Sequence, residues 1–90
     1  MTEIIWTDYL KYRVKLRGFT LESIEDIIRY SNERYFDTST DRWVVVGKDS
    51  NILVMIPHEI SDEGSITPIT IHATTRQQIN YRIKSGRFKK

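Results

Sequence analysis

The residues best suited to chemistry lie near the C-terminus of this sequence, where His72 precedes Arg76 by four positions. Histidine titrates near neutral pH, so it can give or take a proton during a reaction. Arginine presents a planar fork of N–H donors that can hold two oxygens of a phosphate. Arg76 falls in the first turn of an expected helix, where free backbone N–H groups also attract anions. The pair predicts proton transfer and phosphate binding at one strand-to-helix junction.

Each of these residues also has a purely structural interpretation. His72 stands at the expected end of a strand, where its ring could simply hydrogen-bond a loop carbonyl. Arg76 could form a salt bridge with an acidic residue of the second expected helix. The other histidine, His58, follows Pro57 and is expected at the surface.

The sequence carries none of the common signatures of metal or nucleotide chemistry. It has two histidines, no cysteine and no HExxH motif, which leaves too few ligands of the preferred types for a zinc site. A phosphate loop, a GxGxxG turn and a GxSxG elbow are also absent from the sequence. We therefore expect no metal and no other cofactor.

The charge of the chain is distributed unevenly. Residues 1–63 hold all twelve acidic residues but only eight of the fourteen lysines and arginines, a formal charge of −4. Residues 64–90 hold six basic residues and no acidic one, a formal charge of +6. A basic terminal segment on a mildly acidic body indicates a site for phosphate or for an acidic partner, or else a solvated tail. Residues 87–90 are expected to be mobile.

The last expected helix distributes its side chains around its axis at steps of about 100° per residue. Arg76 and Asn80 then share one polar edge, which Arg87 would join if the helix continued that far. Ile79 and Ile83 lie one turn apart and are expected to face the core, with Arg82 beside Ile79. The basic residues are thus spread around the helix rather than gathered in one stripe.

A second basic run lies on the first expected helix. Lys11 and Lys15 share one face of that helix, and Arg13 and Arg17 lie nearly opposite. At least one of the two pairs must face solvent, while the other is free to line a groove between the helices and the sheet.

Four aromatic residues near these cations have two possible roles. Trp6, Tyr9, Tyr12 and Trp43 could offer rings on which unpaired bases stack. In a small domain the more common role of such rings is to pack in the core.

The helices and strands that position these residues are predicted from the spacing of hydrophobic residues and from the glycines, prolines and capping residues at their ends. Pro57 has no N–H to donate, so strand pairing is expected to stop or bulge there. The sequence predicts an α+β domain in the order β-α-α-β-β-β-β-α, with helices packed on an antiparallel sheet. Strands are expected at 4–6, 34–37, 42–46, 52–56 and 66–73, and helices at 8–17, 20–31 and 74–85.

Ninety residues suit one small domain, so residues 1–90 are taken as a single unit. The N-terminus lacks the basic-then-apolar order of a signal peptide, and the longest uncharged apolar run, residues 52–57, is far too short to span a bilayer. We expect a soluble cytoplasmic protein without a membrane partner.

Four short motifs, taken in order, point to a known family. They are Trp6, Lys15-Leu-Arg-Gly-Phe19, Asp41-Arg-Trp43 followed by Gly47, and Ala73-Thr-x-Arg-Gln followed by Tyr81. In these features the chain resembles BrnT-type toxins of bacterial type II toxin–antitoxin systems, which belong to the RelE/ParE-like superfamily. The family usually has Ser-Ala-Arg before its Ala-Thr motif, where this chain has Thr70-Ile-His72, and Arg17 replaces the histidine of a Lys-His-Gly helix end.

The resemblance implies a RelE-like fold and a metal-independent endoribonuclease that cuts mRNA, free or on the ribosome. It also implies a cognate antitoxin that covers the basic groove. His72 would transfer protons, while Arg76 and Arg42 would stabilise charge on the phosphate. The alternatives are a non-catalytic module with a degenerate toxin fold that binds nucleic acid or protein, and an interaction domain with no nucleic-acid role. The candidate RNA-binding residues are Lys15, Arg17, Asn80, Arg82 and Arg87.

Overall fold

Three helices form where a threonine cap precedes residues with helical spacing. Thr7, Thr20 and Thr75 each accept a hydrogen bond from the backbone N–H three residues later, which satisfies one of the free donors of the first turn. In the computed structural model, which describes residues 2–90, the helices are α1 (Asp8–Leu16), α2 (Leu21–Tyr30) and α3 (Arg76–Lys84).

The strands form one antiparallel sheet in the order β4-β3-β2-β1-β6. The remaining strand, β5, pairs with β3 on the edge that also carries β4: β5 pairs with residues 53–55 and β4 with residues 58–60. The expected α+β class is therefore confirmed. The strand bounds are β1 (Glu33–Asp37), β2 (Arg42–Asp49), β3 (Ile52–Ile60), β4 (Ile66–Pro68), β5 (His72–Thr74) and β6 (Phe88–Lys89).

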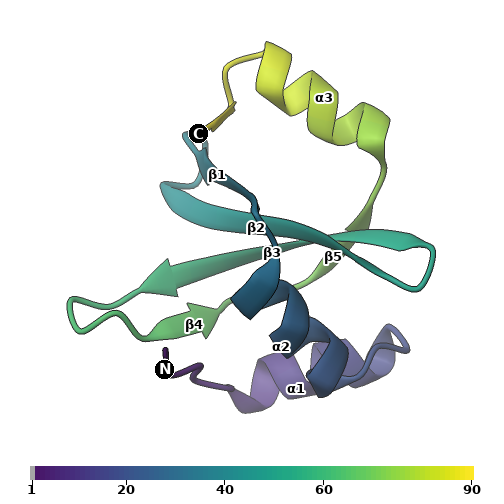
Figure 1. Cartoon of the computed structure of the whole chain (residues 1–90), viewed down its shortest axis with the longest axis vertical. Helices are drawn as coiled ribbons and strands as arrows, with labels where there is room; N and C mark the ends of the chain where they lie inside the picture. The colour runs from purple at the N-terminus through teal and green to yellow at the C-terminus, as the bar shows by residue number, and fades with distance from the viewer. Residues whose placement is uncertain (1) are drawn as a thin grey trace.

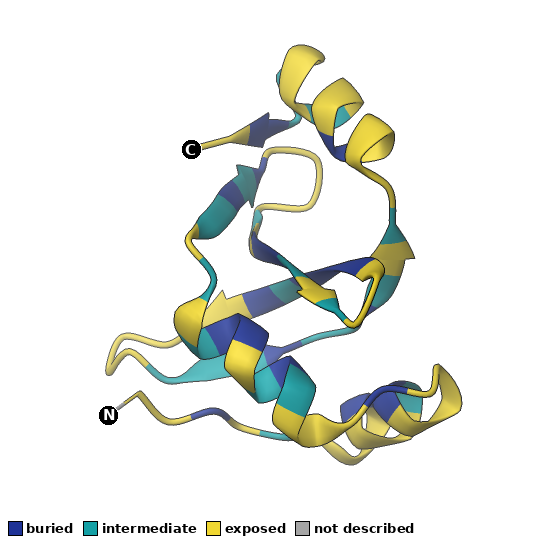
Figure 2. Cartoon of the chain, turned by 45° about the vertical axis from the view of Figure 1, so that its right-hand side comes forward, coloured by how far each residue is buried: buried dark blue, intermediate teal, exposed yellow. Residues whose placement is uncertain are grey.

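The sheet separates two apolar cores, one on each face. Helices α1 and α2 cover one face, while α3 lies on the opposite face, as Figure 1 shows. The first core includes Leu10, Ile24 and Val54. The second, smaller core lies under α3 and includes Ile79 and Phe88. Most of the surface of α3 remains exposed (Figure 2), which leaves its polar residues accessible.

The expected strands at both ends of the sheet differ from the observed ones. Residues 4–6 form no strand, because only Ile4 makes an isolated parallel bridge, to Ile66. The single strand expected over 66–73 is in fact two strands, β4 and β5. The strand β3 continues through Pro57, which pairs with Val44 of β2, but on the other edge the partner of β3 changes there from β5 to β4.

The geometry around Pro57 explains why a proline is tolerated inside β3. Its carbonyl accepts a hydrogen bond from the backbone N–H of Ile69 at 2.8 Å, in the segment between β4 and β5. The N and C=O of one residue point to the same side of a strand. The missing N–H of Pro57 therefore faces the gap between its two partner strands, and no ladder bond is lost.

The C-terminal segment is not the mobile tail that its charge suggested. Arg87 follows the helix rather than continuing it, and Phe88 and Lys89 pair with β1 as β6. Phe88 is buried and stacks on Tyr35, with ring centroids 5.4 Å apart. The buried side chain of Phe88 fixes the position of the segment, and a count of charges does not include such an apolar residue.

Two further expectations about burial are wrong. Ile79 is fully buried, but Ile83 is 40% exposed, because the small core under α3 accommodates one turn of the helix. His58 is buried rather than at the surface, since its side chain lies on the face of β3 that α1 and α2 cover, and its Nδ1 lies 3.0 Å from the carbonyl oxygen of Ile56. Across residues 2–90, no helix is both long and apolar enough to cross a membrane.

Candidate nucleic-acid interface

His72 is the first residue of β5, a short strand that pairs only with β3 within residues 2–90. Its partner in the register is Met55, so its side chain lies on the face of the sheet that α3 covers. The ring is half-buried. Thr75 caps α3 three residues later, so His72 lies close to a helix start as the sequence predicted, although it begins a strand rather than ending one.

Three arginines, from α1 with its C-cap and from α3, lie within electrostatic range of His72. Burial lowers the pKa of the His72 imidazole, and the charges of Arg13, Arg17 and Arg82 lower that pKa further. Arg13 and Arg17 come from α1, and Arg82 comes from α3. We call these four residues the His72 cluster. At neutral pH its imidazole is therefore in the neutral form, which can accept a proton.

The arginines of the His72 cluster are not neutralised by carboxylates. The salt bridges within residues 2–90 use Arg29, Arg42, Arg76 and Arg87, and none of them includes an arginine of this cluster. Every charge that contributes to the pKa shift of His72 is a cation. A cluster of like charges is unfavourable unless an anion joins it, so the arrangement favours a phosphate-bearing ligand.

A local contact holds Arg82 in place, whereas Arg13 has a buried donor without a partner within residues 2–90. The guanidinium of Arg82 lies 5.7 Å from the centroid of the Phe88 ring, within the range of a cation–π contact. The Nε of Arg13 is buried and has no hydrogen-bond partner among the described residues. A buried donor without a partner is costly, and an anion oxygen would satisfy it.

Arg76, the expected phosphate ligand, instead forms a salt bridge within the protein. Its Nη1 and Nη2 donate to Glu33 Oε2 and Oε1 at 2.5 and 2.9 Å. The hydrogen bond from Arg76 is the main cause of the lowered pKa of Glu33. The acidic partner comes from β1, however, and not from the second helix as the sequence suggested. Two of the five N–H donors of Arg76, and its charge, are thus already engaged by Glu33.

Arg87 is likewise engaged. It donates to both carboxylate oxygens of buried Asp37, at 2.9 and 3.0 Å. Burial would raise the pKa of Asp37, but the hydrogen bonds from Arg87 and from the backbone of Ser39 hold it below the usual value. This ion pair ties β6 to β1.

Arg42 lies away from the His72 cluster. It begins β2, and its Nε is 4.0 Å from Glu59 Oε2. Glu59 and Met55, the partner of His72, are four residues apart on β3, which corresponds to about 13 Å along the strand. The structure therefore does not bring Arg42 and His72 together.

The remaining RNA-binding candidates lie on exposed helix surfaces. Lys15 is exposed on α1. Asn80 is exposed on α3 and lines a shallow hollow of about 700 Å³ beside Tyr81 and Lys84. Of the seven other candidate site residues from the sequence, only Arg17 and Arg82 lie close enough to His72 for their charges to act on its pKa.

Arg13 is the functional candidate that sequence reasoning did not select. The signal was the i,i+4 spacing of Arg13 and Arg17, which places both on one side of α1. What the sequence left open was whether this pair or Lys11 and Lys15 faces the groove. In the structure, the charges of Arg13 and Arg17 lower the pKa of His72, and those of Lys11 and Lys15 do not contribute.

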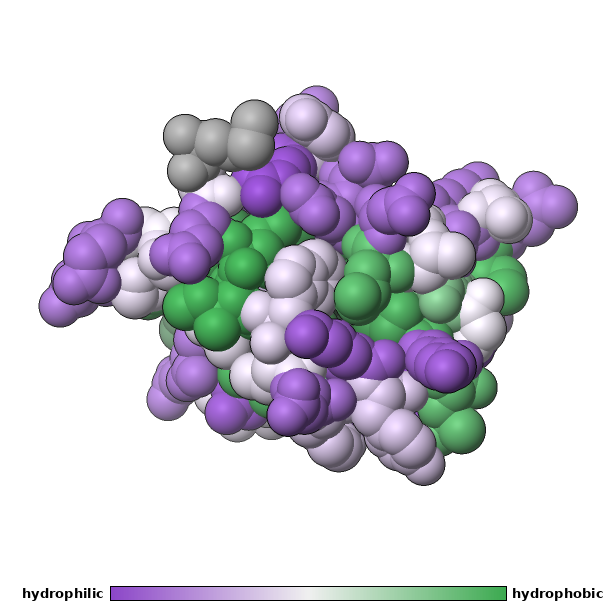
Figure 3. Space-filling model, turned by 90° about the horizontal axis from the view of Figure 1, so that it is seen from below, coloured by the Kyte–Doolittle hydropathy of each residue, from purple (hydrophilic) through white to green (hydrophobic). Residues whose placement is uncertain are grey.

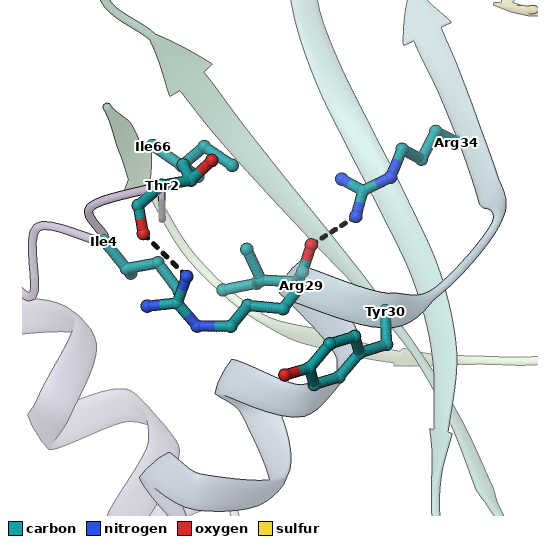
Figure 4. A pocket seen from close by; sticks show the side chains of 7 residues that line it. Thr2, Ile4, Arg29, Tyr30, Arg34 and Ile66 are labelled. Atoms are coloured by element: carbon teal, nitrogen blue, oxygen red, sulfur yellow. Dashed lines mark hydrogen bonds between the residues drawn. The ribbon is translucent and has the colours of Figure 1, made fainter. Parts of the chain in front are cut away.

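A second cavity, of about 370 Å³, lies between the N-terminal segment, α2, β1 and β4 (Figure 4). Two arginines line it, and both bind the protein itself. Arg29 donates to Glu25 at 2.8 Å and to the carbonyl of Thr2 at 2.6 Å. Arg34 donates to the carbonyls of Ile28 and Ser31 near the C-terminal end of α2. These cations hold elements together, so this cavity is not the candidate site.

Residues 2–90 bring together no group of three or more histidine, aspartate or glutamate side chains that could hold a metal ion. Comparisons with family models, with curated proteins and with solved structures found no match to this chain. The functional proposal below therefore rests on the residues of the His72 cluster.

Proposed function

We propose that this protein is a metal-independent endoribonuclease of the toxin type, which acts on single-stranded RNA at the His72 cluster. The observation that carries the proposal is a half-buried histidine whose pKa is lowered by burial and by the charges of three arginines, none of which has a carboxylate partner within residues 2–90. A neutral imidazole beside unpaired cations suits the cleavage of a phosphodiester, which needs a base and stabilisation of negative charge.

In the proposed reaction the ribose 2′-OH attacks the adjacent phosphorus while neutral His72 takes its proton. A bond forms between the 2′ oxygen and phosphorus, and the bond from phosphorus to the 5′ oxygen breaks. The products are a 2′,3′-cyclic phosphate and a 5′-hydroxyl, with the leaving oxygen protonated by solvent. Arg13, Arg17 and Arg82 stabilise the charge that develops on the phosphorane oxygens.

The RelE-like topology, the cytoplasmic location and the pairing with an antitoxin belong to the same proposal. They are supported by the four sequence motifs that resemble the toxin family, the last of which ends at Tyr81, and by the strand-to-helix junction that carries His72. An antitoxin would act by covering the His72 cluster.

The chemistry can be tested with a labelled single-stranded RNA in buffer containing EDTA. We expect cleavage products that end in a 2′,3′-cyclic phosphate, and no cleavage of a matched substrate with 2′-deoxyribose at the cut site. Arg82→Ala should slow cleavage at least tenfold, whereas Arg76→Ala, a matched arginine paired with Glu33, should change the rate less than threefold. An RNA that stays intact with the wild-type protein, alone and with ribosomes, would reject the enzyme proposal.

A non-catalytic RNA-binding module is the second candidate. The observation that favours it is that the His72 cluster contains a single group, His72, that exchanges a proton near neutral pH, while Arg76, an expected catalytic residue, is engaged by Glu33. RNA binding that depends on Arg82 without any cleavage would establish this alternative.

A further inference from the structure

The solvent side of α1 carries apolar residues that the fold does not bury. Tyr9, Tyr12 and Leu16 are 57%, 62% and 59% exposed, although α1 is only nine residues long. Figure 3 views the side of the molecule that carries α1 and α2, and apolar side chains reach its surface between hydrophilic ones. Large apolar side chains gathered on a solvent-facing surface mark an interaction site.

Helical geometry places these residues opposite the core. With steps of about 100° from Tyr9, the side chains of Tyr12 and Leu16 fall within about 60° of it, and the buried Leu10 and Val14 lie at about 100° and 140°. The helix thus has a second apolar face, which runs about 10 Å from Tyr9 to Leu16. We call these three residues the α1 stripe.

Basic residues flank the α1 stripe on both sides. Lys11 and Lys15 lie on one side of it, at about 200° and 240°, and Arg13 and Arg17 lie on the other, at about 40° and 80°. None of the four takes part in a salt bridge within residues 2–90. The lysine side also carries one carboxylate, Asp8 at about 260°, whereas the arginine side carries none. An apolar line between two mainly basic rows complements an amphipathic helix with acidic flanks.

We propose that the α1 stripe docks an acidic amphipathic helix from a protein partner. Its apolar residues would pack on Tyr9, Tyr12 and Leu16, and its carboxylates would pair with the flanking cations. A second copy of the chain fits poorly, because its stripe carries the same positive charge. A membrane fits poorly because α1 divides its apolar residues between two opposite faces, whereas a membrane-surface helix gathers them on one.

Occupation of the α1 stripe has a consequence for the site. Arg13 and Arg17 belong both to the flank of the stripe and to the His72 cluster. Carboxylates that pair with them would compete with RNA phosphates. This competition rests on the proposed function, whereas the docking itself does not.

The docking can be tested with one designed probe. It is a fluorescein-labelled, capped peptide of about 20 residues, with leucines on one helical face and glutamates elsewhere, and fluorescence anisotropy measures its binding at two salt concentrations. We expect binding that weakens with salt and falls at least fivefold in the double variant Tyr12→Ser, Leu16→Ser. Tyr30→Ser, a matched control at an exposed tyrosine on α2, should bind like the wild type.

Several results would overturn the docking proposal. They are absence of binding, equal binding of a scrambled peptide of the same composition, and equal loss in the Tyr30→Ser variant. Stripe-dependent binding to vesicles of phosphatidylcholine and phosphatidylglycerol, tighter than to the peptide, would favour a membrane, and stripe-dependent self-association would favour a second copy.

A competition experiment separates this proposal from the proposed function. The peptide should displace a labelled RNA from the wild-type protein. A peptide that binds the stripe while RNA binding is unchanged would refute the regulatory link. If the protein binds the peptide through the stripe but never cleaves RNA, the docking stands and the enzyme proposal fails.

Discussion

The ability of His72 to accept a proton depends on its burial and on the charged groups near it. A histidine near a carboxylate would hold its proton more strongly, but burial and the charges of Arg13, Arg17 and Arg82 all act in the opposite direction. Since no carboxylate contributes, the imidazole is a base at neutral pH rather than an acid. A bound phosphate would offset the repulsion between the arginines and the protonated ring.

The pH dependence of His72 follows from this environment. Because its pKa lies below the usual 6.5, the ring should lose its proton at lower pH than a free histidine does. Removing one neighbouring cation with Arg17→Gln should raise the pKa. Titration of the His72 ring by NMR checks this, with Arg76→Gln as a control that should leave the midpoint unchanged. A midpoint at or above 6.5 in the wild-type protein would contradict the account.

At the residue scale, the sequence could predict His72 and the strand-to-helix junction, because a capping threonine and a following glutamine mark the helix start. It could not predict which cations are free. Arg76 and Arg87 look the same as Arg82 in the sequence, yet carboxylates on β1 engage the first two. Glu33 and Asp37 are some fifty residues earlier, and only the fold brings them near.

The elements around the site depend on long-range contacts that local patterns do not contain. β6 is two residues long and is held by the burial of Phe88 and by the Arg87–Asp37 pair. The pairing of Phe88 and Lys89 with β1 also fixes the chain that follows α3, and therefore the helix that carries Arg82.

Breaking the Arg87–Asp37 pair should destabilise the fold. Arg87→Ala leaves a buried carboxylate without its partner, and we expect the free energy of unfolding to fall by about 2 kcal/mol. This is less than for a fully buried pair, because Arg87 is partly exposed. Urea denaturation measures the change, with Lys90→Ala as an exposed control. Equal stabilities of the two variants would contradict the role of the pair.

Gly47 permits the close contact between β2 and α2. A methyl group added at this position would lie 2.7 Å from Cγ2 of Ile27. We expect Gly47→Ala to cost about 1–3 kcal/mol of stability through overpacking. In a double-mutant cycle with Ile27→Ala, the cost of the alanine at 47 should shrink, and denaturation of the four proteins measures it. Additive effects would show that the contact is not the cause.

The sequence predicted the helices better than the edges of the sheet. Threonine caps and helical spacing are local signals, so α1, α2 and α3 lie close to their expected ranges. The split into β4 and β5 depends on where β3 changes partner, at Pro57, and the position of β6 depends on Phe88. Those choices are set by neighbours distant in the sequence.

At the scale of the whole molecule, basic residues of the α1 segment and of α3 act together on His72 of β5, although Arg17 and Arg13 are 65 and 69 residues from Arg82 in the chain (82 − 17 and 82 − 13). The uneven charge along the sequence indicated only the C-terminal basic residues, which include Arg82, and not the arginines of the α1 segment. The net charge of +2 conceals a local region in which unpaired arginines outnumber carboxylates. Such a region attracts RNA phosphates and releases counterions when they bind.

Salt dependence of RNA binding follows from the number of unpaired arginines. Three phosphate contacts by Arg13, Arg17 and Arg82 should give a slope of about −2 for the logarithm of the binding constant against that of salt concentration. Arg17→Ala should reduce the slope by about 0.7, and Arg76→Ala should leave it unchanged. Titrations of a single-stranded oligonucleotide by fluorescence anisotropy give these slopes. A slope near zero would exclude binding through phosphates.

The central claim is that His72 is the base of a metal-free cleavage reaction. The most direct measurement is the single-turnover rate of RNA cleavage at pH 7 in EDTA, for the wild-type protein and for His72→Ala, with RNA affinity measured alongside. We predict that the rate falls by about 100-fold or more, while the affinity changes less than threefold, because the arginines remain. Cleavage by His72→Ala at the wild-type rate would contradict the claim.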